Sequence, residues 1–233
     1  MKDRCGRVVT KLTNFHVTPL FDEPLLLRRL TPDGIPEVIL ATWSGGAHAS
    51  NTYYVWALSK KPRCLLAYFK ENVGDLLDFD VVHLGAAKTP QIRSWYDGFG
   101  HYEPDLPIVF RFERGRYQDE TPRYRDLLDG LEDRAWRDLA HVQNIDERSL
   151  HLVALSHLRG NYHQVLNRLK RAVPPATYRW LKASDPLIRA ILKQRYSRYR
   201  YPCAYDLRPV HLERMPGQVL AGRLEDSRPK IGH

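Results

Sequence analysis

His48 could do acid–base chemistry, because it follows two glycines in the segment "SGGAH". Gly45 and Gly46 would let backbone amides approach a ligand, and Ser44 and Ser50 are close in sequence. A catalytic Ser–His pair also needs an acid that orients the histidine. The G-x-S-x-G motif, which carries the nucleophilic serine of many hydrolases, does not occur in the sequence. The segment therefore favours a hairpin loop whose glycines adopt positive φ. A hydrolase centred on His48 stays an alternative, with the following candidate acids: Asp33, Glu37, Asp78 and Asp97.

Arginines and tyrosines alternate in a second segment, "KQRYSRYRYP" (residues 193–202). In nucleic-acid-binding proteins arginines contact phosphates and tyrosines stack on bases. The same side chains also suit an anionic lipid surface or an acidic protein. The plainer interpretation is a helix whose tyrosines continue an apolar stripe while its arginines face water.

The positive charge of the chain is concentrated around this segment. Residues 151–201 contain 11 Lys and Arg against one acidic residue, Asp185, a net charge of +10. Residues 1–150 contain 20 Lys and Arg against 22 Asp and Glu, a net charge of −2. Residues 202–233 contain 5 against 4, a net charge of +1, so the net charge of the whole chain is +9. A concentrated field of this kind attracts anionic partners.

We therefore expect a non-enzymatic binding or assembly protein that docks an acidic protein partner through a basic helical face. A nucleic acid bound by the same face is the alternative, and an anionic membrane surface is a further possible ligand. The residues of this face are Lys170, Arg171, Arg179, Lys182, Arg189, Lys193, Arg195, Tyr196, Arg198, Tyr199 and Arg200.

Two acidic segments each resemble half of a calcium loop. In "DGIPEV" Asp33 precedes a turn glycine and Glu37 closes the segment, and in "DFDVV" Asp78 and Asp80 alternate. Together with "SGGAH", they resemble degenerate FG-GAP or VCBS-type β-repeats of a bacterial, often exported, uncharacterised group, over about residues 27–112. In that family a loop D-x-D-x-D-G-x-x-E holds calcium, because its carboxylates converge on one cation.

The resemblance implies a loop that has lost its calcium. Arg29 and Thr31 fall on the first two acidic positions of the first copy, and Val82 falls on the third position of the second. Because an arginine opposes a divalent cation, we expect no bound metal and no cofactor. Two repeats cannot close a propeller, so we expect a small sheet, a sandwich or a partial barrel.

Histidine spacing predicts no zinc site. His151, His157 and His163 are six residues apart, which places successive side chains on different faces of a helix. Neither H-E-x-x-H nor C-x-x-C occurs.

The remaining signals leave the compartment open. Cys5, Cys64 and Cys203 allow one disulfide with one thiol left over, or three reduced thiols. No apolar run is long enough to span a membrane. The N-terminus lacks the apolar region of a signal peptide, so we expect a periplasmic or secreted protein if a leader was removed and a cytoplasmic one otherwise.

Residues 1–118 predict short antiparallel strands. Apolar or alternating runs are separated by Gly, Pro, Asn and Asp, the residues that favour turns. The runs are "PLLLRRL", "EVILATW", "TYYVWAL", "RCLLAYF", "DFDVVHL", "QIRSWY" and "PIVFRF".

From Thr121 the apolar spacing becomes that of helices. Thr121 predicts the N-cap of a first helix, and Asn144 or Asp146 that of a second helix ending near Gly160. A third helix is expected to run from Tyr162 until Pro174 and Pro175 end it. The second and third together, about residues 146–173, resemble one tetratricopeptide hairpin.

The last predicted helix has Asp185 as its N-cap and Pro186 at its first position, and Pro202 ends it. The sequence thus predicts an α+β fold in which an antiparallel β unit of two degenerate repeats (1–118) precedes a basic helical domain (119–201). This helical domain is expected to pack on the β unit, and residues 202–233 to form an extended tail.

Overall fold

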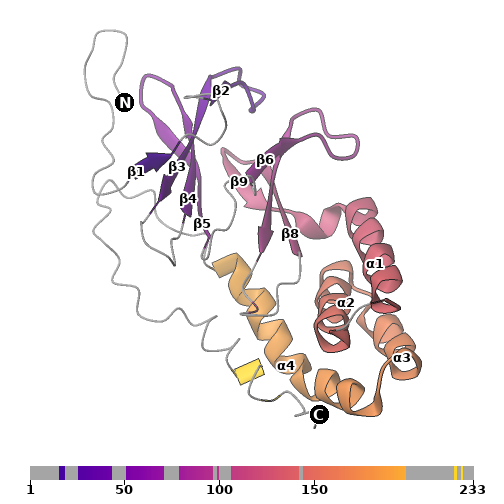
Figure 1. Cartoon of the computed structure of the whole chain (residues 1–233). Helices are drawn as coiled ribbons and strands as arrows, with labels where there is room; N and C mark the ends of the chain where they lie inside the picture. Colours follow the sequence, from indigo (N-terminus) through magenta and orange to yellow (C-terminus); the bar gives the residue numbers. More distant parts are fainter. Residues whose placement is uncertain are drawn as a thin grey trace. The chain divides into compact units, whose positions relative to one another are not determined.

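Two antiparallel sheets precede four helices in this chain, which confirms the predicted α+β class (Figure 1). The computed structural model describes residues 16–18, 26–43, 51–70, 79–96, 99, 106–141, 144–197, 223–224 and 227. The chain divides into two compact units, which we call the sheet unit and the helical unit. The sheet unit comprises Met1–Ser94, Val109–Asp119 and Arg198–His211, and the helical unit comprises Trp95–Ile108, Glu120–Ser197 and Leu212–His233.

The first sheet is built around strand β3 (Glu37–Trp43). Strands β4 (Asn51–Ala57) and β5 (Arg63–Lys70) follow it in an antiparallel meander. The short strands β1 (His16–Thr18) and β2 (Leu26–Arg28) both pair with the other edge of β3. The apolar runs predicted β2 to β5, whereas β1 has no such run.

The second sheet is a meander of β6 (Phe79–Val82), β7 (Gln91–Tyr96), β8 (Leu106–Glu113) and β9 (Arg116–Asp119), in that order. Arg114 and Gly115 form the two-residue turn between β8 and β9, with φ values of 51° and 81°. Positive φ at both turn residues matches the right-handed twist of a hairpin. The sequence predicted β6, β7 and β8 but not β9.

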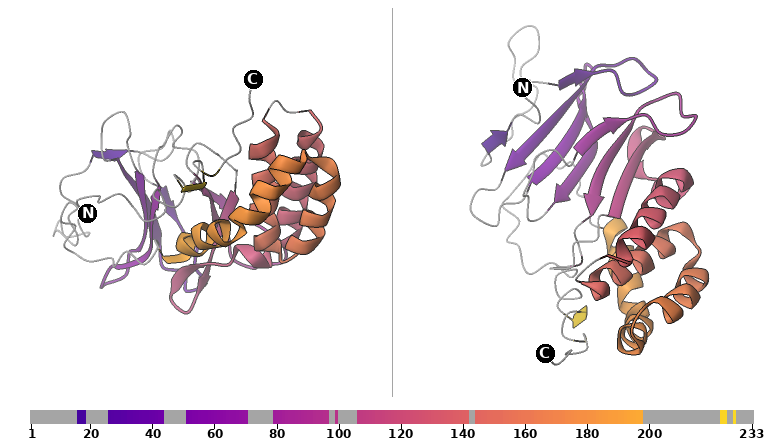
Figure 2. Two further views of the ribbon diagram at one scale, coloured as in Figure 1. Left: turned by 90° about the horizontal axis from the view of Figure 1, so that it is seen from below. Right: turned by 45° about the vertical axis from the view of Figure 1, so that its right-hand side comes forward.

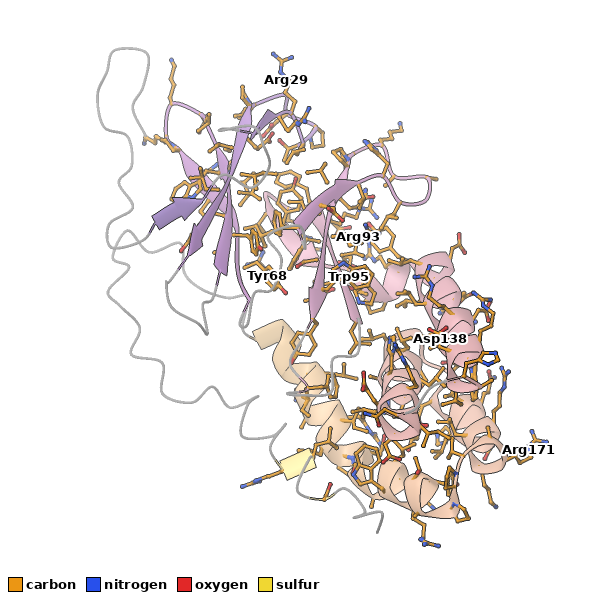
Figure 3. All side chains as sticks on the ribbon, in the orientation of Figure 1. Arg29, Tyr68, Arg93, Trp95, Asp138 and Arg171 are labelled. Atoms are coloured by element: carbon orange, nitrogen blue, oxygen red, sulfur yellow. The ribbon has the colours of Figure 1, made fainter. Side chains whose placement is uncertain are left out.

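Four aromatic rings form the centre of the sheet unit. Tyr53 and Tyr68 come from the first sheet, Phe79 and Phe110 come from the second, and all four are buried. The rings of Tyr53 and Phe79 stack with centroids 4.6 Å apart, and Tyr68 meets Phe110 edge-on at 5.4 Å. This cluster holds the faces of the two sheets together; Tyr68 is labelled in Figure 3.

The helical unit is arranged around helix α2 (Ile145–Arg159). A short 3-10 helix, η1 (Thr121–Arg123), leads into α1 (Arg125–Leu139), and α3 (Tyr162–Ala172) and α4 (Pro175–Ser197) follow α2. Helix α2 contacts the other three helices and is buried on most of its circumference, as expected for the central helix of a bundle (Figure 2). No helix in the described ranges is both long and apolar enough to cross a bilayer.

The predicted ends of α2 are confirmed. The side chain of Asn144 accepts a hydrogen bond from the backbone N–H of Glu147, and Gly160 ends the helix with φ of 82°. Glycine is favoured there because a left-handed C-cap strains other residues. The predicted start of the first helix is wrong, since Thr121 belongs to η1 and α1 begins at Arg125.

The predicted start of the last helix is also wrong. Helix α4 begins at Pro175, so Asp185 and Pro186 lie inside it rather than at its N-terminus. Pro186 lacks the N–H that would bond to the carbonyl of Lys182, which usually costs about 3 kcal/mol. The buried side chains of Trp180 and Leu181 on the first half of α4, and Ile188 on the second, offset that cost.

The aromatic cluster yields a stability prediction. Replacing Phe79 by alanine should lower the free energy of unfolding by about 3–5 kcal/mol, because it leaves a cavity among packed rings. Urea denaturation of the two proteins measures this difference. Val81 on the same strand is only partly buried, so Val81→Ala serves as the control with a smaller loss. A loss below about 1 kcal/mol for Phe79→Ala would contradict the assignment of this ring to the core.

Cysteine pairing yields a second prediction. Cys64 in β5 is disulfide-bonded, and the other two cysteines of the chain, Cys5 and Cys203, lie outside the described residues. We expect thiol titration of the unfolded, unreduced protein to detect one thiol per chain, and titration after reduction to detect three. Three thiols without reductant would show that Cys64 is reduced.

Candidate functional site

Six of the predicted binding residues lie on described parts of α3 and α4, and all six side chains are exposed. We call them the basic face: Lys170, Arg171, Arg179, Lys182, Arg189 and Lys193. Arg171 lies at the end of α3 and points away from the bundle in Figure 3. Of the other residues predicted for this face, Arg195 and Tyr196 belong to the last turn of α4. Arg198, Tyr199 and Arg200 lie outside the described residues.

The cations of α4 form one row because of their spacing. Arg179, Lys182, Arg189 and Lys193 follow one another at intervals of three, seven and four residues, which keeps them on one side of a helix. The buried residues of α4 lie on the opposite side: Trp180, Leu181, Ile188, Ile191 and Leu192. At 1.5 Å per residue the row is about 21 Å long.

The charge of the helical unit is divided unevenly between its helices. Residues 125–159, which include α1 and α2, contain five Lys and Arg against seven acidic residues (−2). Residues 162–197, which are α3 and α4, contain eight against one (+7). Arg159 of α2 pairs with Asp129 and, at 2.8 Å, with Glu132, both on α1, so part of the charge of these two helices is neutralised between them.

Five cations of the basic face have no such partner. Within the described ranges, no acidic side chain pairs with the following residues: Lys170, Arg171, Arg179, Lys182 and Lys193. Their charges are therefore not neutralised by neighbouring described carboxylates, and they can act on a ligand in solvent.

Arg189 differs from the other five because Asp185 holds it. Its Nε donates to Oδ2 of Asp185 at 2.9 Å, and its Nη2 donates to the same oxygen. The other oxygen, Oδ1, lies 2.7 Å from Nε2 of His157 on α2. The His157 ring in turn stacks on Tyr162, the first residue of α3, with centroids 4.4 Å apart. We call this group the Asp185 cluster; it connects α2, α3 and α4.

Burial and hydrogen bonding shift the pKa values of this cluster. Burial lowers the pKa of His157, and the hydrogen bond and charge of Asp185 offset only part of that effect. Burial opposes ionisation of Asp185, but hydrogen bonds from Arg189 and His157 outweigh it, so the pKa of Asp185 is lowered. Burial, followed by the nearby charge of Asp185, raises the pKa of Tyr162 to about 12. At neutral pH the cluster therefore contains an ionised aspartate, a neutral histidine and a neutral tyrosine.

The first acidic segment forms a hydrogen-bonded turn before β3. Thr31 donates its hydroxyl toward Asp33 at 2.7 Å and also lies within hydrogen-bond distance of the buried Glu37 carboxylate. The backbone N–H of Leu30 donates to the other Glu37 oxygen at 2.8 Å. Arg29, at the first ligand position of the resembled motif, is exposed and points into solvent (Figure 3). The carboxylates of this turn are therefore bonded to their own loop.

The other predicted acidic and catalytic residues are not brought together in the described ranges. Asp80 forms a cross-strand ion pair with Arg93 at 2.7 Å. Asp78, Asp97 and His48 lie outside the described residues, so a hydrolase centred on His48 stays a prediction. In the part of the chain that the structure describes, no group of three or more His, Cys, Asp or Glu side chains could hold a metal ion.

Comparisons with family models, curated proteins and solved structures found no match to this chain. The resemblances to FG-GAP repeats and to a tetratricopeptide hairpin therefore stay predictions. The basic face and the Asp185 cluster are the features of the described residues that bear on function.

The lowered pKa of His157 predicts a pH dependence of stability. In the unfolded chain His157 has the ordinary histidine pKa of 6.5, and in the folded chain its pKa is lower. As pH falls below 6.5, the unfolded chain therefore takes up a proton more readily than the folded chain, and the free energy of unfolding decreases. The stability advantage of wild type over His157→Gln should therefore shrink from about pH 7.5 to about pH 5.5. Urea denaturation at both pH values measures it. An advantage that is constant or larger in acid would contradict the buried, neutral state of His157.

Proposed function

We propose that this chain is a non-enzymatic binding or assembly protein whose basic face docks an acidic protein partner. The observation that carries this proposal is the set of exposed cations on α3 and α4, five of which have no described acidic partner, whereas residues 125–159 have a net charge of −2. Like charges that lie close together on two helices repel one another, which lowers stability. An anion bound to these helices reduces that repulsion.

The length and shape of the row fit a macromolecular ligand. A row of about 21 Å spans roughly four helical turns, more than a single small anion can contact. Four cations at helical spacing can each meet one carboxylate of an extended or helical acidic segment. Such contacts mainly speed association and select the partner by charge, since each exposed pair contributes only about 0.2–1 kcal/mol.

Charge reversal on the basic face tests the proposal. The full chain should bind poly-L-glutamate, and its affinity should fall as salt rises, because screening weakens contacts between exposed charges. The double variant Lys182→Glu and Lys193→Glu should bind about tenfold more weakly or worse, since it removes two attractive contacts and adds two repulsive ones. Fluorescence anisotropy with labelled polymer measures both effects.

Two exposed lysines of the sheet unit supply the matched control. Lys60→Glu with Lys61→Glu makes the same change in net charge, and both residues are exposed. This variant should bind nearly as well as wild type. Equal losses for both double variants would show that only overall net charge matters. A preference for single-stranded DNA or RNA over poly-L-glutamate at equal salt would favour the nucleic-acid alternative.

A further inference from the structure

Within the basic face, Arg189 is held in place by a described acidic residue. Its Nε and Nη2 both donate to Oδ2 of Asp185, while the Arg189 side chain stays 63% exposed. Asp185 itself is only 8% exposed. The guanidinium is therefore fixed on its inner side and open on its outer side.

The free edge of this guanidinium has the geometry of a carboxylate site. An arginine has five N–H donors, and the contacts with Asp185 use two of them. The end of the fork, formed by Nη1 and the second hydrogen of Nη2, is left to meet two oxygens of one carboxylate side by side. Lysine cannot reproduce this contact, because its ammonium is a point charge on a flexible stem.

The Asp185 cluster reduces the entropy cost of using Arg189. His157 holds the second oxygen of Asp185 at 2.7 Å, and the stacked ring of Tyr162 fixes His157. Elements from three helices therefore determine where the guanidinium lies before any ligand arrives. Immobilising a long free side chain on binding costs conformational entropy, and for Arg189 part of this entropy is already lost on folding.

The aromatic residues of α3 and α4 favour a carboxylate ligand over a single-stranded nucleic acid. Tyr162 is stacked on His157, Trp180 is buried with its indole N–H donated to Ser227, and Tyr178 is half-buried. None of the described tyrosine and tryptophan side chains of the two helices is exposed. Their one exposed described ring is the imidazole of His163, which meets Tyr162 edge-on, whereas single-strand binding stacks successive bases on several rings.

We propose that Arg189 is the specificity-determining residue of the basic face, that it binds one carboxylate of the acidic protein partner through its free Nη1–Nη2 edge, and that Asp185 positions it. This inference rests on the proposed function, because it names the central contact of the same surface. The neighbouring cations Lys182 and Lys193 supply attraction without fixed geometry.

The substitution Asp185→Asn distinguishes binding driven by net charge alone from binding that needs a fixed Arg189. Asp185 neutralises the charge of Arg189, so Asp185→Asn raises the net charge of the face by one. If only the field matters, Asp185→Asn tightens the binding of an acidic polymer. If Arg189 acts by its fixed geometry, Asp185→Asn weakens binding despite the extra positive charge.

The experiment compares two Arg-to-Lys substitutions on the same helix. Arg189→Lys and Arg179→Lys make the same chemical change, but Arg179 is not held by a described acid. Binding of poly-L-glutamate to the full chain is measured by anisotropy across a salt series. We expect Arg189→Lys to weaken binding about tenfold and Arg179→Lys by less than about twofold. The salt slope should stay unchanged in both, since no charge is lost. Thermal unfolding of each variant shows that it is folded.

The outcomes separate this inference from the function on which it rests. No binding by wild type at low salt would remove the proposed function and this inference together. Salt-dependent binding by wild type with equal effects of Arg189→Lys and Arg179→Lys would overturn only the role of Arg189. Tighter binding by a folded Asp185→Asn variant would likewise overturn positioning, whereas weaker binding supports it. Arg189→Lys keeps Asp185 and its contact with His157, so it tests the role of Arg189 even if Asp185→Asn fails to fold.

Discussion

A single buried carboxylate constrains the arrangement of the helical unit. Asp185 is 8% exposed and ionised, and an unpaired charge at such a site would be strongly destabilising. It is satisfied by His157 from α2 and by Arg189 from its own helix, four residues later. The requirement to pair this charge fixes the register of α4 against α2. It also fixes which cation of the exposed row becomes rigid.

The sheet unit has a different organisation, because apolar contacts rather than charges hold its centre together. Tyr53, Tyr68, Phe79 and Phe110 place two rings from each sheet in one buried cluster. Two of its described acidic residues are engaged locally, Glu37 by Thr31 and Asp80 by Arg93. Within the helical unit the excess of positive charge lies on α3 and α4, where the apolar residues face inward and the cations outward.

Local sequence signals predicted most elements but not the Asp185 cluster. The run "EVILATW" coincides with β3, and Gly160 ends α2 as expected. Both signals could be found in the sequence because an apolar run and a glycine C-cap depend only on residues close together in the chain. Strands β1 and β9 have three and four residues and no apolar run, so nothing local marked them. Asp185–Pro186 has the pattern of a helix start, yet packing carries α4 through it. His157 and Asp185 are 28 residues apart on different helices, and no spacing rule links them.

If the proposed acidic partner binds to α3 and α4, lysine acetylation footprinting locates the bound surface directly. The full chain is treated with an acetylating reagent with and without saturating poly-L-glutamate, and modified lysines are identified by mass spectrometry. The account predicts that the polymer protects Lys170, Lys182 and Lys193 and leaves the exposed Lys60 and Lys88 of the sheet unit unchanged. Equal protection of all five lysines, or protection confined to Lys60 and Lys88, would contradict it.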